Sequence, residues 1–174
     1  MIRRVLLVGL LLVAAAVLET ALFPALSLLA VRTDLLLLVV VGFGLRDGPV
    51  AGMRVGFAAG LLADLLLSQA PVGLTVLVFT VIGYLVGVAR PYLAPDSWTA
   101  PILLSAVAGL LGTAAYGTLV RLLGDERVTT TLILQASLTV AMTSALLAPV
   151  VVRVVTRLSD AFPLRGTVLS DPVS

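Results

Sequence analysis

Two acidic side chains stand inside long apolar stretches of this sequence, and they are its best candidates for chemistry. Asp64 and Glu19 each lie near the end of an apolar segment. An ionisable group within a hydrophobic span is costly in a bilayer and points to a polar contact or a function. For Asp64 we weigh a structural hydrogen bond, to a backbone group or to Arg32 or Arg121, against a docking charge, a cation site and a proton relay. Glu19 lies closer to the interface, where we expect water to solvate it.

A row of glycines leads to Asp64. Gly52, Gly56 and Gly60 precede it at intervals of four residues. Each step of four turns the direction by only about 40° on an α-helix, so the acid and the glycines share one side. We expect that side to face protein. The candidates for a partner contact or an intramembrane polar site are therefore Asp64, Gly52, Gly56, Gly60 and Glu19.

The residue types that many enzymes need are missing. The chain has no His and no Cys, and all 11 of its basic residues are Arg. Thiol chemistry, histidine catalysis and zinc sites built from these side chains are therefore excluded. The sequence also lacks a Walker loop and the second intramembrane carboxylate of an aspartyl protease. We predict no catalytic residue, no metal, no cofactor and, without a basic stripe on a soluble surface, no nucleic-acid partner.

The composition places the chain in a membrane. Its 174 residues are 60% hydrophobic and 11% charged, whereas a soluble domain is about 45–50% apolar and about 25% charged. We therefore predict an integral membrane protein that is embedded in the lipid bilayer. Continuous apolar runs, such as residues 35–41, favour helices over the alternating strands of a membrane β-barrel.

The apolar segments predict an all-α, polytopic transmembrane bundle of about six spans. A helix needs about 20 residues to cross a bilayer. The six segments are Val5–Leu22, Leu35–Leu45, Val50–Leu67, Val72–Ala89, Pro101–Val120 and Leu132–Val152. The second is short, and residues 35–67 could instead form a re-entrant pair or one broken helix. Because Arg46-Asp47-Gly48-Pro49 is typical of a turn, we prefer two spans.

The arginines predict the orientation of these spans. With the N-terminus inside the cell, eight arginines fall on the cytoplasmic side and three outside. The two groups are Arg3, Arg4, Arg46, Arg54, Arg90, Arg153, Arg157 and Arg165, against Arg32, Arg121 and Arg127. The positive-inside rule then places both termini in the cytoplasm. We expect one domain, residues 1–158, and a mobile cytoplasmic tail, residues 159–174. The first segment also fits a signal peptide, but the five segments after it favour an uncleaved span.

Further rows of small residues predict close packing between helices. They are Ser105, Gly109, Thr113 and Gly117 in one segment, and Gly83 and Gly87 in another. Small residues spaced by four allow helix backbones to approach closely in lipid. We favour packing within the chain over partner docking, although both are compatible if one face of a row stays open.

Five short stretches follow one another in a characteristic order. They are Arg32–Leu38, Arg46–Gly52, Gly56–Leu66, Pro71–Leu74 and Gly83–Gly87. In this order they resemble the MreD family of bacterial rod shape-determining membrane proteins. The glycine row that ends in Asp64, followed by a Pro-x-Gly-Leu turn, is the most specific part. Thr33 is a departure, because the family often has Pro at that position.

The resemblance implies a six-helix bundle similar to the substrate-binding subunits of energy-coupling-factor transporters. It also implies a non-enzymatic component of the cell-wall elongation machinery in the bacterial inner membrane. The implied partners are an MreC-like protein and, through it, a class B penicillin-binding protein, a RodA-like glycosyltransferase and MreB. We expect the groove near the glycine rows and Asp64 to receive a single-span partner helix. The alternative is a transporter subunit that binds a vitamin-like substrate, although 5% aromatic residues are few for such a site.

Overall fold

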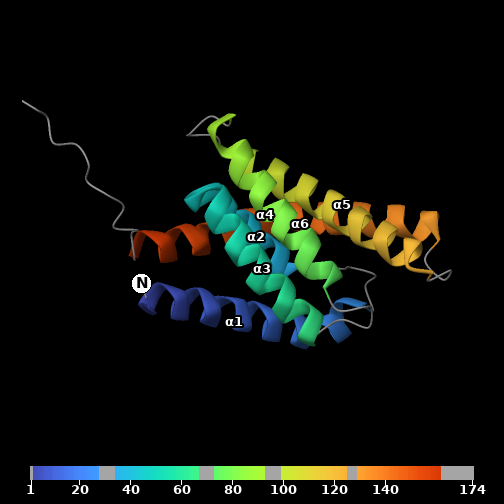
Figure 1. The fold of residues 1–174 in the computed structure, drawn as a ribbon, viewed down its shortest axis with the longest axis horizontal. Coiled ribbons are helices and arrows are strands. Elements are labelled where there is room, and N and C mark those ends of the chain that lie inside the picture. The colour runs from blue at the N-terminus through green and yellow to red at the C-terminus, as the bar shows by residue number, and fades with distance from the viewer. Residues whose placement is uncertain (1, 28–33, 67–72, 93–98, 125–128, 162–174) are drawn as a thin grey trace, which may run out of the picture.

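A bundle of α-helices makes up the part of the chain that the computed structural model describes, which is residues 2–27, 34–66, 73–92, 99–124 and 129–161. Within these ranges the helices are α1 (Ile2–Ser27), α2 (Leu35–Asp47), α3 (Pro49–Leu66), α4 (Leu74–Ala89), α5 (Thr99–Leu122) and α6 (Thr130–Ala161). A short 3-10 helix, Arg90–Tyr92, extends α4. The all-helical bundle expected from the sequence is confirmed (Figure 1). Of the expected tail, residues 159–161 belong to α6, and residues 162–174 lie outside the described residues.

The helices differ in whether they are long enough to cross a membrane. Four described segments are long and apolar enough: Pro49–Leu66, Leu74–Tyr92, Thr99–Leu122 and Thr130–Arg157. In α1 the apolar stretch whose side chains are described, Leu6–Ala21, is shorter than these four segments. Helix α2 has 13 residues and is about 20 Å long, against a hydrocarbon core of about 30 Å. Four of the six expected segments are thus long and apolar enough to span a membrane, whereas α2 and the described apolar stretch of α1 are shorter.

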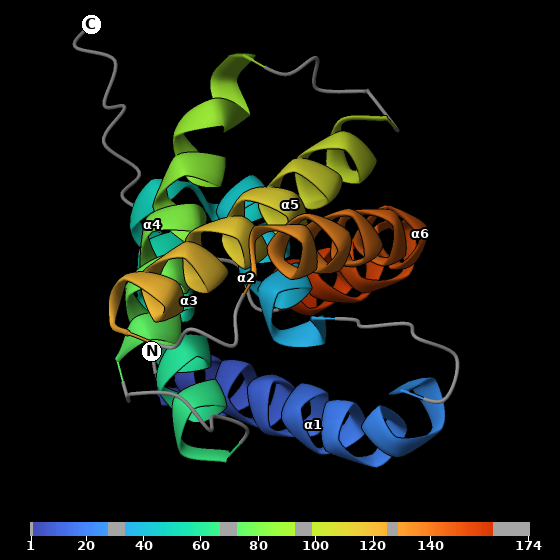
Figure 2. The same ribbon diagram turned by 90° about the vertical axis from the view of Figure 1, so that its right-hand side faces the viewer.

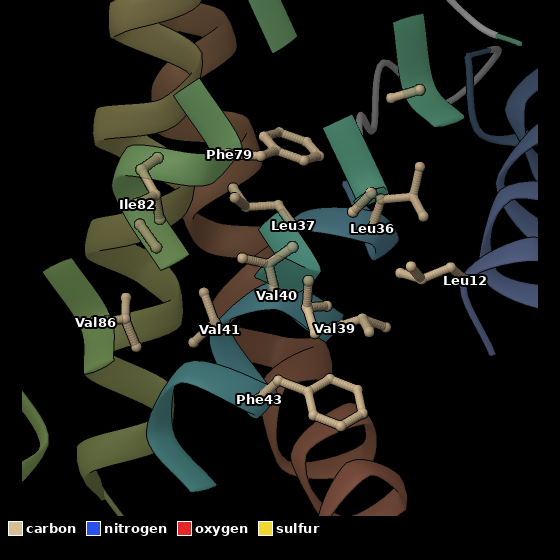
Figure 3. Close-up of a cluster of buried hydrophobic side chains, with 14 of the residues drawn as sticks. Leu12, Leu36, Leu37, Val39, Val40, Val41, Phe43, Phe79, Ile82 and Val86 are labelled. Atoms are coloured by element: carbon tan, nitrogen blue, oxygen red, sulfur yellow. The ribbon is translucent and has the colours of Figure 1, made fainter. Parts of the chain in front are cut away.

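Helix α2 is the centre of the bundle. Ten consecutive residues, Leu35 to Gly44, are buried. Figure 3 shows Val39 and Leu36 on the side of α2 that faces Leu12 of α1, and Val41 on the side that faces Val86 of α4. A helix that is apolar all round has to be enclosed by other helices. This enclosure explains why the short second segment is stable without facing lipid along its length.

A tight turn separates α2 from α3, as the charged sequence there predicts. Gly48 has φ 90°, a left-handed conformation that glycine adopts without steric cost. Its N–H donates to the Gly44 carbonyl oxygen at 3.0 Å. Pro49 then starts α3, where the missing N–H of proline costs no hydrogen bond. The predicted turn is therefore present and divides these residues into two helices, but of the two expected spans only α3 is long enough to cross a membrane.

Helix α1 lies at one side of the bundle. It packs mainly on α2 and α3 (Figure 2), and Ala15 also packs against the cluster that Leu35 and Leu38 of α2 form with Ala148 of α6. Leu12 and Ala16 are its buried side chains in the core. The start of α1 and the end of α6 lie at the same end of the bundle (Figure 1).

Candidate functional site

Asp64 joins the end of α3 to the beginning of α4. Its side chain is only 4% exposed. Oδ2 accepts hydrogen bonds from the backbone N–H groups of Gly73, at 2.7 Å, and Val76, at 3.4 Å. The first N–H groups of a helix have no partner within the helix, and its N-terminus favours negative charge. Asp64 therefore serves as the cap that α4 does not obtain from its own N-cap residue, Gly73.

The second carboxylate oxygen of Asp64 has a different environment. Oδ1 is buried and has no hydrogen-bond partner among the described residues. Of the two arginines proposed as partners, Arg121 donates instead to the Thr130 hydroxyl, and Arg32 lies outside the described residues. The α4 N-terminus is thus the part of the described structure that stabilises this carboxylate.

The glycine row of α3 faces α4. A Cβ atom placed on Gly52 would approach the carbonyl oxygen of Gly83 to well under 3.0 Å. The same substitution at Gly56 would meet the backbone of Phe79, and at Gly60 the backbone of Val76. The two helix backbones are in direct contact along the row. The groove that we expected a partner helix to enter is therefore filled by α4 in this structure, because only glycine permits so close an approach.

The small residues of α4 complete the same contact. Gly83 lies against Gly52, and Gly87 lies against Pro49 at the start of α3. Gly44 of α2 also approaches the carbonyl oxygen of Gly83. These glycines therefore lie at the contacts among α2, α3 and α4.

The row on α5 packs against α6. A Cβ on Gly109 would meet the Ser144 side chain, and one on Gly117 would meet Ile133. In the same row, Ser105 is buried and Thr113 is half-buried. Within the part of the chain that the structure describes, the hydroxyl oxygens of Ser105 and Ser144 have no hydrogen-bond partner.

Gly112 has a contact that the sequence row did not include. It lies outside the four-residue spacing and faces Ile82 of α4 and Leu37 of α2. Helix α5 is therefore small-residue packed on two sides. A search of the sequence for small residues at one fixed spacing finds only one of these two packing sides.

A second acidic site lies at the beginning of α2, and sequence reasoning missed half of it. Asp34 precedes α2, and its Oδ1 accepts from the Leu37 N–H at 2.9 Å. Glu19 of α1 faces the same helix end, where the N–H groups of Leu36 and Leu35 act as donors. Glu19 is half-buried rather than solvated as expected, and its Oε2 is buried with no hydrogen-bond partner among the residues described. An Asp directly before an apolar run is the N-cap signal that would have identified Asp34.

Replacing Asp34 with Ala should destabilise the bundle by about 1 kcal/mol, the usual cost of losing an N-cap side chain. Asp34→Asn should keep most of the stability, because Asn accepts the same hydrogen bond. The free energy of unfolding in detergent, measured on both variants, checks this. Equal losses for Ala and Asn would show that the charge of Asp34, rather than the cap, carries the effect.

Asp64, Asp34 and Glu19 therefore each lie at the N-terminus of a helix. Among the residues that the structure describes, no group of three or more His, Cys, Asp or Glu side chains could hold a metal ion. What the arrangement does is hold helix ends in place: Asp64 holds α4, and Asp34 with Glu19 holds α2.

Comparison with known proteins points to one family. The family model described as rod shape-determining protein MreD matches residues 2–155 of the chain. No curated protein matches the chain, and no solved structure matches it.

Proposed function

Because the chain belongs to the MreD family of rod shape-determining proteins, we propose that it serves the cell-wall elongation machinery by contact, without catalysing a reaction. In this proposal it binds an MreC-like protein and, through it, helps to organise a class B penicillin-binding protein, a RodA-like glycosyltransferase and MreB. The family match over residues 2–155 is the observation that carries the proposal.

The buried polar groups stabilise the bundle itself, which supports a role in binding other proteins rather than in catalysis. Asp64 and Asp34 accept hydrogen bonds from helix N-termini, so their charges stabilise the bundle itself. The glycines of α3 pack against the backbone of α4, and those of α4 pack against the backbone of α3. Because the interior residues of the bundle pack against one another, a partner would bind to the outer faces of its helices. No observation on the described residues favours the alternative of a substrate-binding transporter subunit.

We place the partner contact on an outer face instead of the glycine row. On α3 the face opposite α4 exposes Phe57, Leu61 and Leu65. In a membrane such a face is covered by lipid or by another helix. A single-span partner can reach it without opening the contact between α3 and α4.

The arginines support a location in the bacterial inner membrane with both termini in the cytoplasm. Five described arginines lie near the end of α2, near the beginning of α3, after α4 and near the end of α6: Arg46, Arg54, Arg90, Arg153 and Arg157. Positive residues concentrate on the cytoplasmic side of membrane proteins. The beginning of α1 and the end of α6 share one end of the bundle.

Single-cysteine crosslinking tests the proposal, and the chain is suited to it because it has no Cys of its own. A photoreactive maleimide is attached at exposed positions on three helices: Phe57 on α3, Leu111 on α5 and Met142 on α6. We expect one of these faces to capture an MreC-like protein in cells. Cysteine at Ser105, which is 1% exposed, is the matched control and should capture none.

Two results would contradict the proposal. One is that an MreC-like protein neither co-purifies with the chain nor crosslinks from any exposed helix face. The other is that the adduct forms from the buried control position as efficiently as from the exposed ones, since the bundle would then open in a way that this packing does not allow.

A further inference from the structure

One end of the bundle carries a band of exposed arginines. The band consists of Arg46, Arg54, Arg90, Arg153 and Arg157, and all five side chains are exposed. Two contacts show that their helices share this end: Gly87 of α4 lies against Pro49 of α3, and Gly42 of α2 lies against Val155 of α6. The arginines thus come from four helices and lie towards the same face of the membrane.

The opposite end has the reverse charge among the described residues. It carries the acids Glu19, Asp34 and Asp64, with Arg121 as the cation that the described ranges contribute there. At the arginine end, Asp47 is the acidic residue whose side chain is described. The described charges are therefore separated along the bundle, positive at the end where α1 begins.

Each arginine on the outer helix faces stands next to exposed apolar side chains. Arg54 lies between Val50 and Phe57, one helical turn away on either side, and both are more than half exposed. Arg157 follows the exposed Val154 by three residues. Residues three or four apart share one face of a helix. The guanidinium can bind a phosphate, and the apolar side chains beside it can contact an acyl chain of the same lipid.

We propose that this arginine band binds the phosphate headgroups of anionic phospholipids in the leaflet at that end. Arg54 belongs to α3 and Arg157 to α6, which lie on different sides of α2 (Figure 2). Charges spread over several sides suit many small anions around the bundle, whereas an acidic protein domain would need one compact patch. Arg also pairs with phosphate through two parallel hydrogen bonds, which strengthens such a contact. This inference does not depend on which protein partner the chain binds.

The expected size of the effect follows from the charge alone. A basic residue near an anionic membrane surface contributes roughly a fivefold preference for that surface. Removing three arginines should therefore reduce the preference for anionic lipid by more than about tenfold. The preference should also fall as salt rises, because exposed charges are screened within about 10 Å at 0.1 M ionic strength.

Competition between two lipids tests the proposal on the full-length purified chain. Native mass spectrometry measures the ratio of phosphatidylglycerol to phosphatidylcholine that remains bound from an equimolar mixture. The triple variant R54Q/R90Q/R157Q should lower this ratio at least tenfold. R121Q, at the other end of the bundle, is the matched control and should stay within twofold of the wild type. R54K/R90K/R157K keeps the charges and should retain most of the preference.

The outcomes separate lipid binding from its competitors. An unchanged lipid ratio in a folded, monodisperse triple variant overturns the proposal. Loss of a co-purified protein from the triple variant, with the lipid ratio unchanged, also overturns it and assigns the band to an acidic protein. An equal drop in R121Q shows a general charge effect and contradicts a localised band. If the triple Gln variant does not fold, the single variants R54Q, R90Q and R157Q should each lower the ratio about fivefold, and an unchanged ratio in all three overturns the proposal.

Discussion

Replacing Gly52 with Val should prevent most of the chain from accumulating as a folded bundle. A Cβ at this position would meet the Gly83 backbone of α4 and the Gly44 backbone of α2, both closer than 3.0 Å. Backbone atoms cannot rotate away as a flexible side chain does. Overpacking of a well-packed core costs about 1–3 kcal/mol and sometimes more, and here two helix contacts are forced apart at once. We expect a severalfold loss in the yield of monodisperse protein after detergent extraction.

Gly9→Val is the matched control for this experiment. It makes the same chemical change in a helix, but a Cβ at Gly9 has no atom within 4 Å. Its yield and thermal unfolding midpoint should stay close to those of the wild type. If Gly52→Val and Gly9→Val behaved alike, the backbone contact between α3 and α4 would not be what holds the bundle.

Replacing Asp64 with Ala should destabilise the protein by about 2–3 kcal/mol. The variant loses a charged hydrogen bond to Gly73, and such bonds contribute about 1.5–3 kcal/mol. It also leaves the first N–H groups of α4 without an acceptor in a part of the protein where water is scarce. The free energy of unfolding in detergent measures the loss.

Asp64→Asn separates the cap from the charge. Asn keeps an oxygen that can accept from the Gly73 N–H but loses the interaction of the negative charge with the α4 N-terminus, which contributes about 0.3–1 kcal/mol. We therefore expect the stability order Asp, Asn, Ala. A stable Asn variant that fails to bind the MreC-like protein of our proposal, where the wild type binds it, would show that the charge of Asp64 acts in docking as well. An Ala variant as stable as the wild type would contradict the capping role.

Much of the local structure could be predicted from the sequence because it depends on residues close together in the chain. Apolar runs of helical length gave the six helices within a few residues of their observed ends, except that α1 and α6 extend further. The turn at Gly48 could be predicted because charge, glycine and proline coincide there. The missing His and Cys removed whole classes of chemistry without reference to any fold.

The positions of the candidate site residues could be predicted only in part. The alignment of Gly52, Gly56, Gly60 and Asp64 on one helix face followed from their spacing. The spacing did not predict which helix packs on that face, because this helix, α4, comes later in the chain. The packing of α4 on this row and the hydrogen bond from the Gly73 N–H to Asp64 depend on that return.

By itself, the sequence determined that this protein is a membrane bundle with small-residue helix faces, an aspartate within one span and a glutamate nearer the interface. Only the tertiary structure decided that α2 is enclosed, that the glycine row is occupied and that Asp34 joins Glu19 at one helix end. The physical reason is that composition and spacing are properties of each helix alone. Burial, backbone contact and the capping of one helix by another exist only once the helices have packed together.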